Sequence, residues 1–576
     1  MKTALYKDFF GSVKLRFSAQ GKKGIEEMQG LMMDTPLLVS MILRHADLHH
    51  PNREIVSVTA DNPLHRYTYA DLARRSRKLA NALASLGLAQ GDRVATIAWN
   101  DYRHMEIYYG VGGSGYVCHT INPRLFPEQL VFIINHAEDR WIFTDPMFVP
   151  LLEKIAEQTP GVEGYVVMTT EEMMPETSLK NAVSYESLIA DESDEFEWPE
   201  FDEREAVALC YTSGTTGDPK GVLYSHRSTI LHAYAAVAPD VMNLSNRDSV
   251  LPVVPLFHVN AWGVPYSAFI VGAKLAFPGP KMGDGEALYG LLESEEVTLA
   301  LGVPTVWLAL LQYTAKAGKT MTKLQRTIVG GAAVPESMIR EFKTKHDVEL
   351  IQGWVMTEMS PLGTANSPKV GMESMTDDER FALGTKAGRA IFGCEIRIVD
   401  DDGKELPWDG VAYGALQVRG PWICSDYFKL EGQSGSHTDD GWFDTGDVAT
   451  IDPNGYMAIT DRTKDVIKSG GEWISSIEIE NNAIGHPAVA EAAVIGVAHP
   501  KWTERPLLIV IKAEGQDLSK EEMLAWLDGK IAKWWLPDDV VFVDDIPHTA
   551  TGKIKKVELR KQFADYQLPG QAHTKD

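Results

Sequence analysis

One loop constrains the fold more than any other part of the sequence. An apolar stretch, AVALCY, predicts a strand, and six small residues follow it, TSGTTG at 212–217, with Lys220 three residues later. Such a loop is costly to order, because glycine loses more backbone freedom on folding than any other residue. It is not a Walker A motif, since GK[ST] is absent, and a simple surface turn needs far fewer such residues. The loop therefore predicts a backbone nest for phosphate, with the lysine adding positive charge.

The rest of the chain alternates helical and strand patterns, which predicts an α/β fold with largely parallel sheets. Past residue 390, short strands with Asp-Gly and Asn-Gly turns indicate an antiparallel meander or small barrel, followed by a compact α+β block. The 576 residues exceed the roughly 250–300 at which single cores stop growing. The predicted organisation is an N-terminal extension over 1–34, a large domain over 35–461, a hinge over 462–465 and a small C-terminal domain over 466–576.

Composition limits the partners. The net charge of −25 disfavours nucleic acid or an anionic membrane as the main partner, and no apolar run approaches the roughly 18 residues of a membrane span. Four cysteines lie far apart, which predicts reduced, buried thiols in a cytoplasmic protein: Cys118, Cys210, Cys394 and Cys424. The basic, amphipathic start of the chain predicts a poorly ordered extension, with a transit peptide or a membrane-contacting arm as alternatives.

Six further motifs follow the loop in order: PLFHVNAWG (255–263), GGAAVP (330–335), QGWVMTE (352–358), GWFDTGD (441–447), DRTKDVIKSGGEWIS (461–475) and PHTATGKIKK (547–556). With TSGTTGDPKG they resemble the signature motifs of the adenylate-forming superfamily, which includes acyl-CoA synthetases, luciferase-type enzymes and peptide-synthetase adenylation domains. The resemblance covers nearly the whole chain after residue 35. It implies a large nucleotide-binding domain and a small mobile C-terminal domain.

The resemblance implies the nucleotide site. Glu358 resembles the magnesium ligand, Thr357 the hydroxyl that contacts phosphate, and Asp447 and Arg462 the ribose contacts, while Trp354 stands where the family usually has a tyrosine that stacks on adenine. Val355 stands where glycine is usual. The expected ATP- and AMP-binding residues are Thr212, Ser213, Gly214, Thr215, Thr216, Gly217, Lys220, Gly331, Ala332, Ala333, Gln352, Gly353, Trp354, Thr357, Asp447, Ile459, Arg462 and Lys553, with Thr216 as a second magnesium contact.

The resemblance also implies two half-reactions. Lys553 resembles the lysine that bridges the substrate carboxylate and the α-phosphate during adenylation, and the small domain then rotates so that CoA attacks the acyl-adenylate. Lys464 and Asp465 are expected at the hinge. Lys468, Gly470, Gly471 and Trp473 are expected at the CoA tunnel. The expected co-substrates are ATP with Mg²⁺ and coenzyme A, and a homodimer is compatible with the sequence.

The acyl pocket is predicted from the same motifs. His258 resembles the gate residue near the carboxylate, and Trp262, one turn further on, places a bulky ring that shortens the pocket. The expected pocket residues are His258, Val259, Trp262, Gly263, Pro304, Val329, Gly330 and Met359. No aspartate stands in PLFHVNAWG to bind an amino group, which argues against an amino acid substrate.

The stretches MMDTPLLVSMILRHADLHHPNREIVSV, FHVNAWGVPY and GWVMTEMSP resemble one branch of the family most. This branch contains the 3-methylmercaptopropionate–CoA and short-to-medium-chain fatty-acid–CoA ligases. Tryptophan and methionine side chains suit a thioether acid, and they suit butyrate or hexanoate nearly as well. The expected function is therefore an AMP-forming acid–CoA ligase for 3-methylmercaptopropionate, with a medium-chain fatty acid as the alternative substrate. A luciferase-like oxygenase, which shares the first half-reaction, is the alternative from another class.

Overall fold

The structure is a computed structural model that describes residues 30–212, 219–430, 432, 434–462, 465–470, 472–548 and 554–569, without the side chains of Glu472 and Trp473. The chain divides into two compact units, residues 1–35 and 36–576. The described elements begin with helix α1 (Val39–His49). The domain boundary that we predicted at 461–465, with its hinge over 462–465, stays a prediction.

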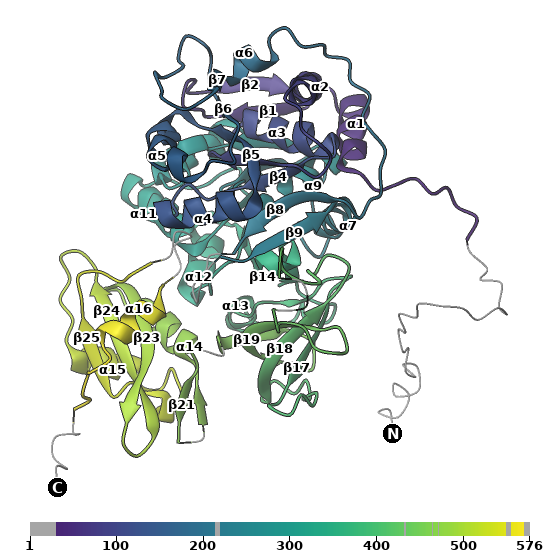
Figure 1. Cartoon of the computed structure of the whole chain (residues 1–576). Helices are drawn as coiled ribbons and strands as arrows, with labels where there is room; N and C mark the ends of the chain where they lie inside the picture. The colour runs from purple at the N-terminus through teal and green to yellow at the C-terminus, as the bar shows by residue number, and fades with distance from the viewer. Residues whose placement is uncertain are drawn as a thin grey trace. The chain divides into compact units, whose positions relative to one another are not determined.

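A seven-stranded sheet forms the first α/β layer (Figure 1). Its order is β7-β6-β5-β3-β4-β8-β9, and every neighbouring pair is parallel except β8–β9. Its strands are β3 (Arg93–Ile97), β4 (Val117–Thr120), β5 (Asp139–Thr144), β6 (Gly164–Val167), β7 (Val183–Ser184), β8 (Ala206–Tyr211) and β9 (Gly221–Ser225). The helices of this part of the chain are α2 (Tyr69–Ser85), α3 (Tyr102–Gly113), α4 (Pro127–Ala137), α5 (Val149–Ile155), α6 (Tyr185–Ile189) and α7 (His226–Ala236).

Helix α2 shows why the predicted pattern folds as it does. The Thr68 side chain accepts a hydrogen bond from the backbone of Asp71, whose carboxylate in turn accepts from the Thr68 backbone, so a capping box starts the helix. Leu72, Leu79 and Leu83 lie on one face and are fully buried. The spacing of Leu72, Leu79, Leu83 and Leu86 before Gly87 predicts such a helical stripe, which is confirmed, with Leu86 as the C-cap residue of α2.

A nine-stranded sheet forms the second layer, in the order β16-β15-β14-β13-β12-β10-β11-β1-β2. The pairs from β14 through β1 are parallel, and antiparallel strands flank them at both ends. Its strands are β1 (Glu54–Ser57), β2 (His65–Thr68), β10 (Ser249–Pro252), β11 (Lys274–Phe277), β12 (Leu299–Gly302), β13 (Arg326–Val329), β14 (Glu349–Val355), β15 (Leu362–Ala365) and β16 (Arg389–Ala390). Its helices are α8 (Val259–Trp262), α9 (Val264–Val271), α10 (Gly285–Ser294), α11 (Pro304–Ala317), α12 (Glu336–His346) and α13 (Asp377–Gly384).

The predicted antiparallel meander is a four-stranded sheet, drawn in green in Figure 1. It runs β17 (Glu395–Val399), β18 (Tyr413–Arg419), β19 (Phe443–Ile451) and β20 (Met457–Arg462) in sequence order, with every pair antiparallel. This local topology is what successive strands joined by tight turns produce.

The C-terminal residues form a separate α+β sheet, which was also predicted. Its strands are β21 (Ile467–Ser469), β22 (Glu472–Ile474), β23 (Val489–His499), β24 (Thr503–Lys512) and β25 (Asp539–Phe542), and its helices are α14 (Ser476–Ile484), α15 (Lys520–Leu527) and α16 (Lys556–Gln562). Side chains alternate along β23, so that Val494 packs into the core with α14 and α15 while Ile495 packs into the core with Leu559 of α16. The sheet therefore has a hydrophobic core on each face.

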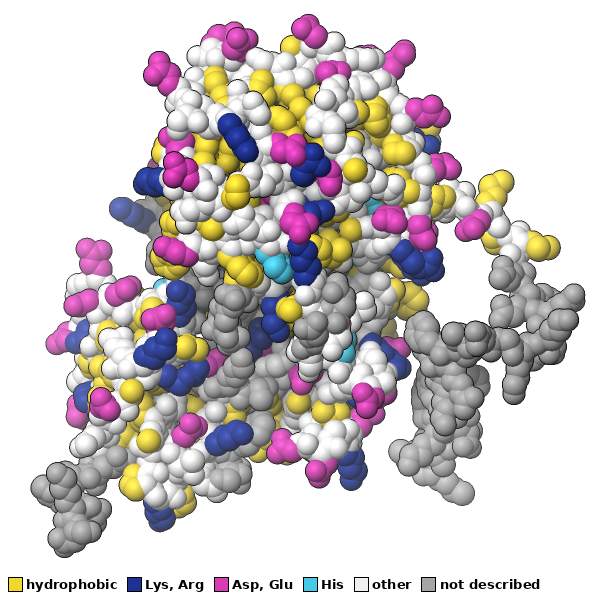
Figure 2. Space-filling view, in the orientation of Figure 1, with side chains coloured by type: hydrophobic (Ala, Val, Ile, Leu, Met, Phe, Trp, Pro, Cys, Tyr) yellow, Lys and Arg dark blue, Asp and Glu magenta, His cyan; other side chains and the backbone are white. Residues whose placement is uncertain are grey.

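The surface carries charges of both signs. Figure 2 shows lysine and arginine side chains interspersed with aspartate and glutamate over the face in view. Among the described residues, no helix is both long and apolar enough to cross a bilayer. The four cysteines are free; three are buried and Cys424 is half-buried.

Candidate active site

The predicted site residues follow the ends of four neighbouring strands. β10, β12, β13 and β14 lie side by side in that order and run parallel. His258 follows β10, Pro304 follows β12, Gly330 follows β13 and Glu358 follows β14. The carboxyl ends of parallel strands share one edge of a sheet, where α/β proteins bind their ligands. The topology therefore gathers motifs that are far apart in the sequence.

The glycine-rich loop joins two antiparallel strands. Tyr211 at the end of β8 lies opposite Gly221 at the start of β9. Just beyond them, the Thr212 N–H donates to the Lys220 carbonyl at 2.9 Å, and the Lys220 N–H donates to Thr212 Oγ1 at 3.1 Å. These bonds close the base of the loop. The remaining predicted residues, Ser213, Gly214, Thr215, Thr216 and Gly217, lie outside the described part of the chain.

A tyrosine that the motifs did not indicate connects Lys220 with Glu358. The Tyr427 hydroxyl donates to Glu358 Oε1 at 2.7 Å, and Lys220 Nζ lies 4.6 Å from the centre of the Tyr427 ring. Burial raises the pKa of Tyr427, so its hydroxyl is a protonated donor at neutral pH. Tyr427 thus bridges the loop lysine and the predicted magnesium ligand by a hydrogen bond and a cation–π contact.

The turn with Thr357 and Glu358 is fixed through its backbone as well. Both side chains are buried, and both residues belong to a single 3₁₀ turn, Thr357–Met359. The Tyr224 hydroxyl on β9 donates to the Thr357 carbonyl at 2.6 Å, and the Cys424 N–H donates to the Glu358 carbonyl at 2.8 Å. Contacts from two distant segments therefore hold the turn, and the sequence pattern singled out neither Tyr224 nor Cys424 for this role.

The predicted ribose contacts lie together. Asp447 on β19 and Arg462 on β20 are directly opposite in the antiparallel ladder, and Arg462 Nε lies 2.8 Å from Asp447 Oδ1. The other carboxylate oxygen, Oδ2, accepts a hydrogen bond from Trp354 Nε1 at 2.9 Å. Asp447 and Trp354 are both buried, whereas about half of the Arg462 side chain is exposed. The predicted residue Ile459 lies on the same strand as Arg462.

The two glycines after β13 are needed for different reasons: Gly330 for lack of space and Gly331 for its backbone conformation. A Cβ atom on Gly330 would lie 2.9 Å from the Gly353 carbonyl oxygen and 3.2 Å from Cη2 of Trp262, and Gly331 has φ +82°. Ala332 and Ala333 follow in the same loop, exposed and half-buried. Next to it on β14, Gln352 Oε1 is buried and has no hydrogen-bond partner among the described residues. This buried acceptor is therefore available to a ligand donor.

The segment that begins the predicted acyl pocket has an unusual backbone. Val259–Trp262 form the one helical turn indicated by the spacing of His258 and Trp262, but the turn is left-handed, with φ between 46° and 57°. Gly263 continues it at φ +78°. For residues with a Cβ this conformation costs about 1–2 kcal/mol each, so tertiary contacts must compensate.

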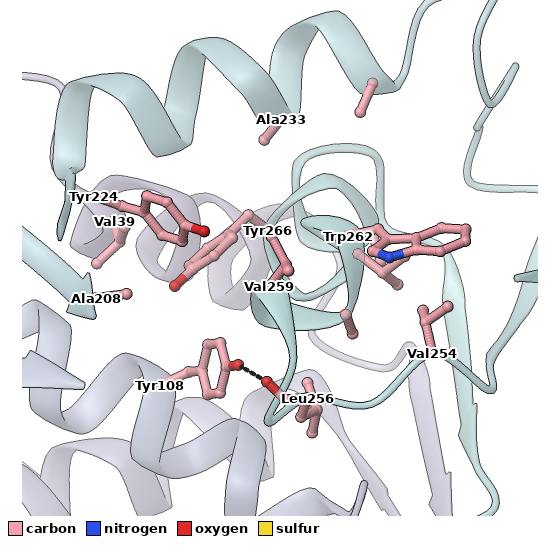
Figure 3. Packing of buried hydrophobic residues seen from close by; sticks show 14 of the residues in the cluster. Val39, Tyr108, Ala208, Tyr224, Ala233, Val254, Leu256, Val259, Trp262 and Tyr266 are labelled. Carbon is pink, nitrogen blue, oxygen red and sulfur yellow. Dashed lines mark hydrogen bonds between the residues drawn. The ribbon is translucent and has the colours of Figure 1, made fainter. Parts of the chain in front are cut away.

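Those contacts come from Tyr108 on α3. Its hydroxyl donates to the Leu256 carbonyl at 2.6 Å, drawn as a dashed line in Figure 3, and lies 3.1 Å from Asn260 Oδ1 within the turn. A Cβ on Gly263, which follows the turn, would lie 2.8 Å from the His232 ring. Side chains from other helices therefore pack against the turn and the glycine after it.

The left-handed turn sets the position of Trp262. Figure 3 shows its indole on the opposite side of the turn from Tyr224. The Gly330 Cβ position lies 3.2 Å from Trp262 Cη2 and 3.3 Å from Val355 Cγ2. Two bulky side chains therefore converge on one glycine at the sheet edge, which narrows the space there.

The other predicted pocket residues are distributed unevenly. Met359 is fully buried in the same hydrophobic cluster as Trp262 and Val259, and His258 and Pro304 are half-buried at the starts of α8 and α11. Val329 belongs to a different cluster, around Trp307, so the structure does not bring its side chain to Trp262.

The C-terminal predictions are only partly described. The Lys468 N–H donates to Glu504 Oε2 at 2.9 Å, and a Cβ on Gly470, which has φ +61°, would lie 2.9 Å from Trp502. Asp465 forms an ion pair with Arg560, with 2.6 Å between Oδ1 and Nη1. Lys464, Gly471, Lys553 and the side chain of Trp473 lie outside the described residues.

Comparison with known proteins decides the family. The AMP-binding enzyme family matches residues 43–428, and the AMP-binding enzyme C-terminal domain matches residues 478–553. The chain belongs to the AMP-binding enzyme family. The predicted superfamily and the predicted α/β fold with a small C-terminal domain are therefore confirmed.

Individual members of the AMP-binding enzyme family are close relatives. A 3-methylmercaptopropionyl-CoA ligase of Ruegeria lacuscaerulensis is 53% identical over 93% of this chain and 99% of that protein. A medium-chain-fatty-acid–CoA ligase of Ectopseudomonas oleovorans is 49% identical over 94% of this chain and 98% of that protein. Among solved structures, the anthranilate–CoA ligase AuaEII in complex with anthranoyl-AMP aligns with a TM-score of 0.82 and 25% identity, covering 93% of this chain and 99% of that chain.

Proposed function

We propose that this protein is an ATP-dependent, AMP-forming acid–CoA ligase. A carboxylate attacks the α-phosphate of ATP to give an acyl-adenylate and pyrophosphate, and the CoA thiolate then attacks the acyl carbon and releases AMP. The observation that carries the proposal is the connection of Lys220, Tyr427 and Glu358 beside the sheet edge where the other motifs meet. A cation and a carboxylate held next to a glycine-rich loop suit a triphosphate with its metal.

The nucleotide fits the described residues. Gln352 Oε1 supplies a buried acceptor for an exocyclic amine, and the bare backbone of Gly330 and Gly331 lets a flat base approach. Asp447 accepts hydrogen bonds from the ribose hydroxyls, since an ionised carboxylate has about four lone-pair sites and the described residues place two donors on it.

Magnesium fits the donor set. Glu358 is a buried carboxylate whose Oε1 already accepts the Tyr427 hydroxyl, and its remaining lone pairs suit a hard cation that also takes phosphate oxygens. When bound, the ion neutralises charge that develops on the phosphates. Thr216 is the second proposed contact. Lys220 and Lys553 add positive charge, and Lys553 must approach the α-phosphate for adenylation.

The acid is short or medium in length. Trp262 and Val355 both approach Gly330, so the pocket is narrow at that point. We propose 3-methylmercaptopropionate as the substrate, supported by the 53% identity to a ligase of that name, with a medium-chain fatty acid as the second candidate because of the 49% identity to a ligase of that class. A soft thioether packs well against Trp262 and Met359.

The second half-reaction needs the C-terminal residues. Gly470, which leaves no room for a side chain beside Trp502, is proposed to line the CoA tunnel with Lys468, Gly471 and Trp473. The small domain is proposed to pivot at Lys464 and Asp465 between the two half-reactions. We place the enzyme in the cytoplasm, in line with its reduced thiols.

The test is direct detection of the products. Purified protein is incubated with ATP, Mg²⁺, CoA and one acid at a time, and mass spectrometry identifies the thioester. The proposal expects acyl-CoA from 3-methylmercaptopropionate and from acids of similar length, with AMP as the nucleotide product. Acyl-adenylate that accumulates with oxygen consumption and without thioester would indicate the oxygenase instead.

A further inference from the structure

The indole of Trp354 connects two separate sheets at the nucleotide site. Trp354 lies near the end of β14 in the nine-stranded sheet, and Asp447 lies on β19 in the four-stranded sheet. The hydrogen bond from Nε1 to Oδ2 is 2.9 Å long, and both residues are buried, at 7% and 3% exposure. A hydrogen bond to a charged acceptor in a buried setting is stronger than one in water.

The opposite end of the Trp354 ring is fixed by close packing. A Cβ on Gly363, which lies on the neighbouring strand β15, would be 2.7 Å from Cε3 and 2.8 Å from Cζ3 of Trp354. Only a glycine leaves this space to the six-membered ring. The indole of Trp354 therefore cannot rotate freely, because a rotation that moves its N–H would bring the six-membered ring into the β15 backbone.

Among the residues that the structure describes, two donors reach Asp447, and they contact different carboxylate oxygens. Trp354 Nε1 bonds Oδ2, and Arg462 Nε lies 2.8 Å from Oδ1. The Arg462 side chain is about half exposed, so solvent weakens its ion pair with Asp447, whereas the indole donor of Trp354 is buried. The rotation of the carboxylate is thus set mainly by Trp354. A fixed carboxylate loses less entropy when it accepts further hydrogen bonds.

We infer that Trp354 is a positioning residue for ribose recognition, acting through its N–H on Asp447. This inference rests on the proposed function, which places the nucleotide ribose at Asp447. It goes beyond stacking on the base: one side chain serves the base with its ring and the sugar with its N–H. A phenylalanine or tyrosine at this position keeps an aromatic ring but has no indole N–H.

The test is a cycle that combines protein variants with nucleotide variants. Binding of AMP, 2′-deoxyAMP and 3′-deoxyAMP is measured by calorimetry, without metal or acid, for the wild type, Trp354→Phe and Trp354→Tyr. In the wild type, removing a recognised hydroxyl is expected to weaken binding about tenfold, a typical effect of one hydrogen bond to a charged group. In both variants AMP binding is expected to weaken about tenfold, while the deoxy penalty shrinks to less than about threefold. If Trp354→Phe does not fold, the same affinities are compared between the wild type and Trp354→Tyr.

Each of the other outcomes contradicts one specific claim. An undiminished deoxy penalty in the variants would mean that Trp354 acts on the base or on the fold alone, and would overturn this inference. A wild type that binds AMP and both deoxy forms equally would remove the ribose role of Asp447, and the inference with it. A wild type that binds no AMP would contradict the proposed function itself. Trp408→Phe, at an exposed tryptophan on a loop, is the matched control and should leave all three affinities unchanged.

Discussion

The Tyr427 hydroxyl donates to Glu358 Oε1 at 2.7 Å, while the ring of the same tyrosine lies under Lys220 Nζ. One side chain therefore positions a proposed magnesium ligand and a proposed phosphate contact. Tyr427→Phe keeps the ring and removes only the hydroxyl. We predict that it lowers kcat/KM for ATP by about 10–100-fold, the usual range for a lost hydrogen bond to a charged group, and raises the Mg²⁺ concentration needed for half-maximal rate.

The matched control for Tyr427→Phe is Tyr456→Phe. That tyrosine is also buried, and its hydroxyl donates to the backbone carbonyl of Ser367 at 2.7 Å rather than to Glu358. Titration of the rate with Mg²⁺ should separate the two variants. An unchanged Mg²⁺ requirement in Tyr427→Phe would contradict the positioning role.

Replacing Trp262 by a smaller side chain should allow the enzyme to accept longer acids. Trp262→Ala removes the ring that approaches Gly330, and Val355→Gly removes the other bulky group. Each methylene buried in the new space contributes about 0.8 kcal/mol, or roughly fourfold in kcat/KM. Rates over a series from butyrate to decanoate check this, with the exposed Trp408→Ala as control. The same ranking of acids in all four proteins would remove Trp262 and Val355 from the pocket.

Lys553 is predicted to act in adenylation only. Lys553→Ala should abolish acid-dependent pyrophosphate release, because no positive charge then bridges the carboxylate and the α-phosphate. Thioester formation from supplied acyl-AMP should remain near the wild-type rate. Lys561→Ala, an exposed lysine on α16, is the control and should keep both steps. If both half-reactions fall together in folded Lys553→Ala, the assigned role is wrong.

A buried histidine next to the left-handed turn makes stability depend on pH. Burial lowers the pKa of His232 to about 4, and its Nε2 accepts the Leu362 N–H at 3.3 Å, so the folded protein holds it neutral. The unfolded chain binds this proton near pH 6.5 and therefore binds more protons between the two values. The stability contribution is complete above pH 6.5 and is lost as the pH falls toward 4, by about 3 kcal/mol.

His232→Gln keeps an acceptor without this titration. We predict that the fall in melting temperature between pH 7 and pH 4.5 is smaller in His232→Gln than in the wild type, whatever the melting temperature at pH 7. His45→Gln, at an exposed position of α1, should behave as the wild type. Parallel pH profiles for the wild type and His232→Gln would show that His232 does not carry the effect.

The sequence predicted those parts of the fold that depend on local patterns. The helix expected from Leu72, Leu79 and Leu83 is α2, the short strands past residue 390 form the antiparallel sheet, and the parallel α/β layers follow from the alternation of elements. Each of these follows from periodicity and turn residues within a short window. The family followed from seven ordered motifs.

The features that the sequence did not predict depend on contacts between residues that are far apart in the chain. The left-handed turn at Val259–Trp262 is contacted by Tyr108, whose hydroxyl donates to Leu256 and lies near Asn260 from another helix. Tyr427 gains its role only because the chain returns to Glu358. Trp354 was predicted to stack on adenine, and its N–H bond to Asp447 depends on how two sheets meet. No local pattern records such contacts.

The most direct measurement is the stoichiometry of a single reaction with 3-methylmercaptopropionate, ATP, Mg²⁺ and CoA. We predict that pyrophosphate, AMP and acyl-CoA appear in equal amounts and that none of them forms without the acid. Without CoA, the amount of pyrophosphate should level off at about one molecule per enzyme molecule. Acids of similar length should give the same ratio, at rates that decline as the chain lengthens. Release of ADP and phosphate, or no acid-dependent pyrophosphate with any acid from acetate to palmitate, would contradict it.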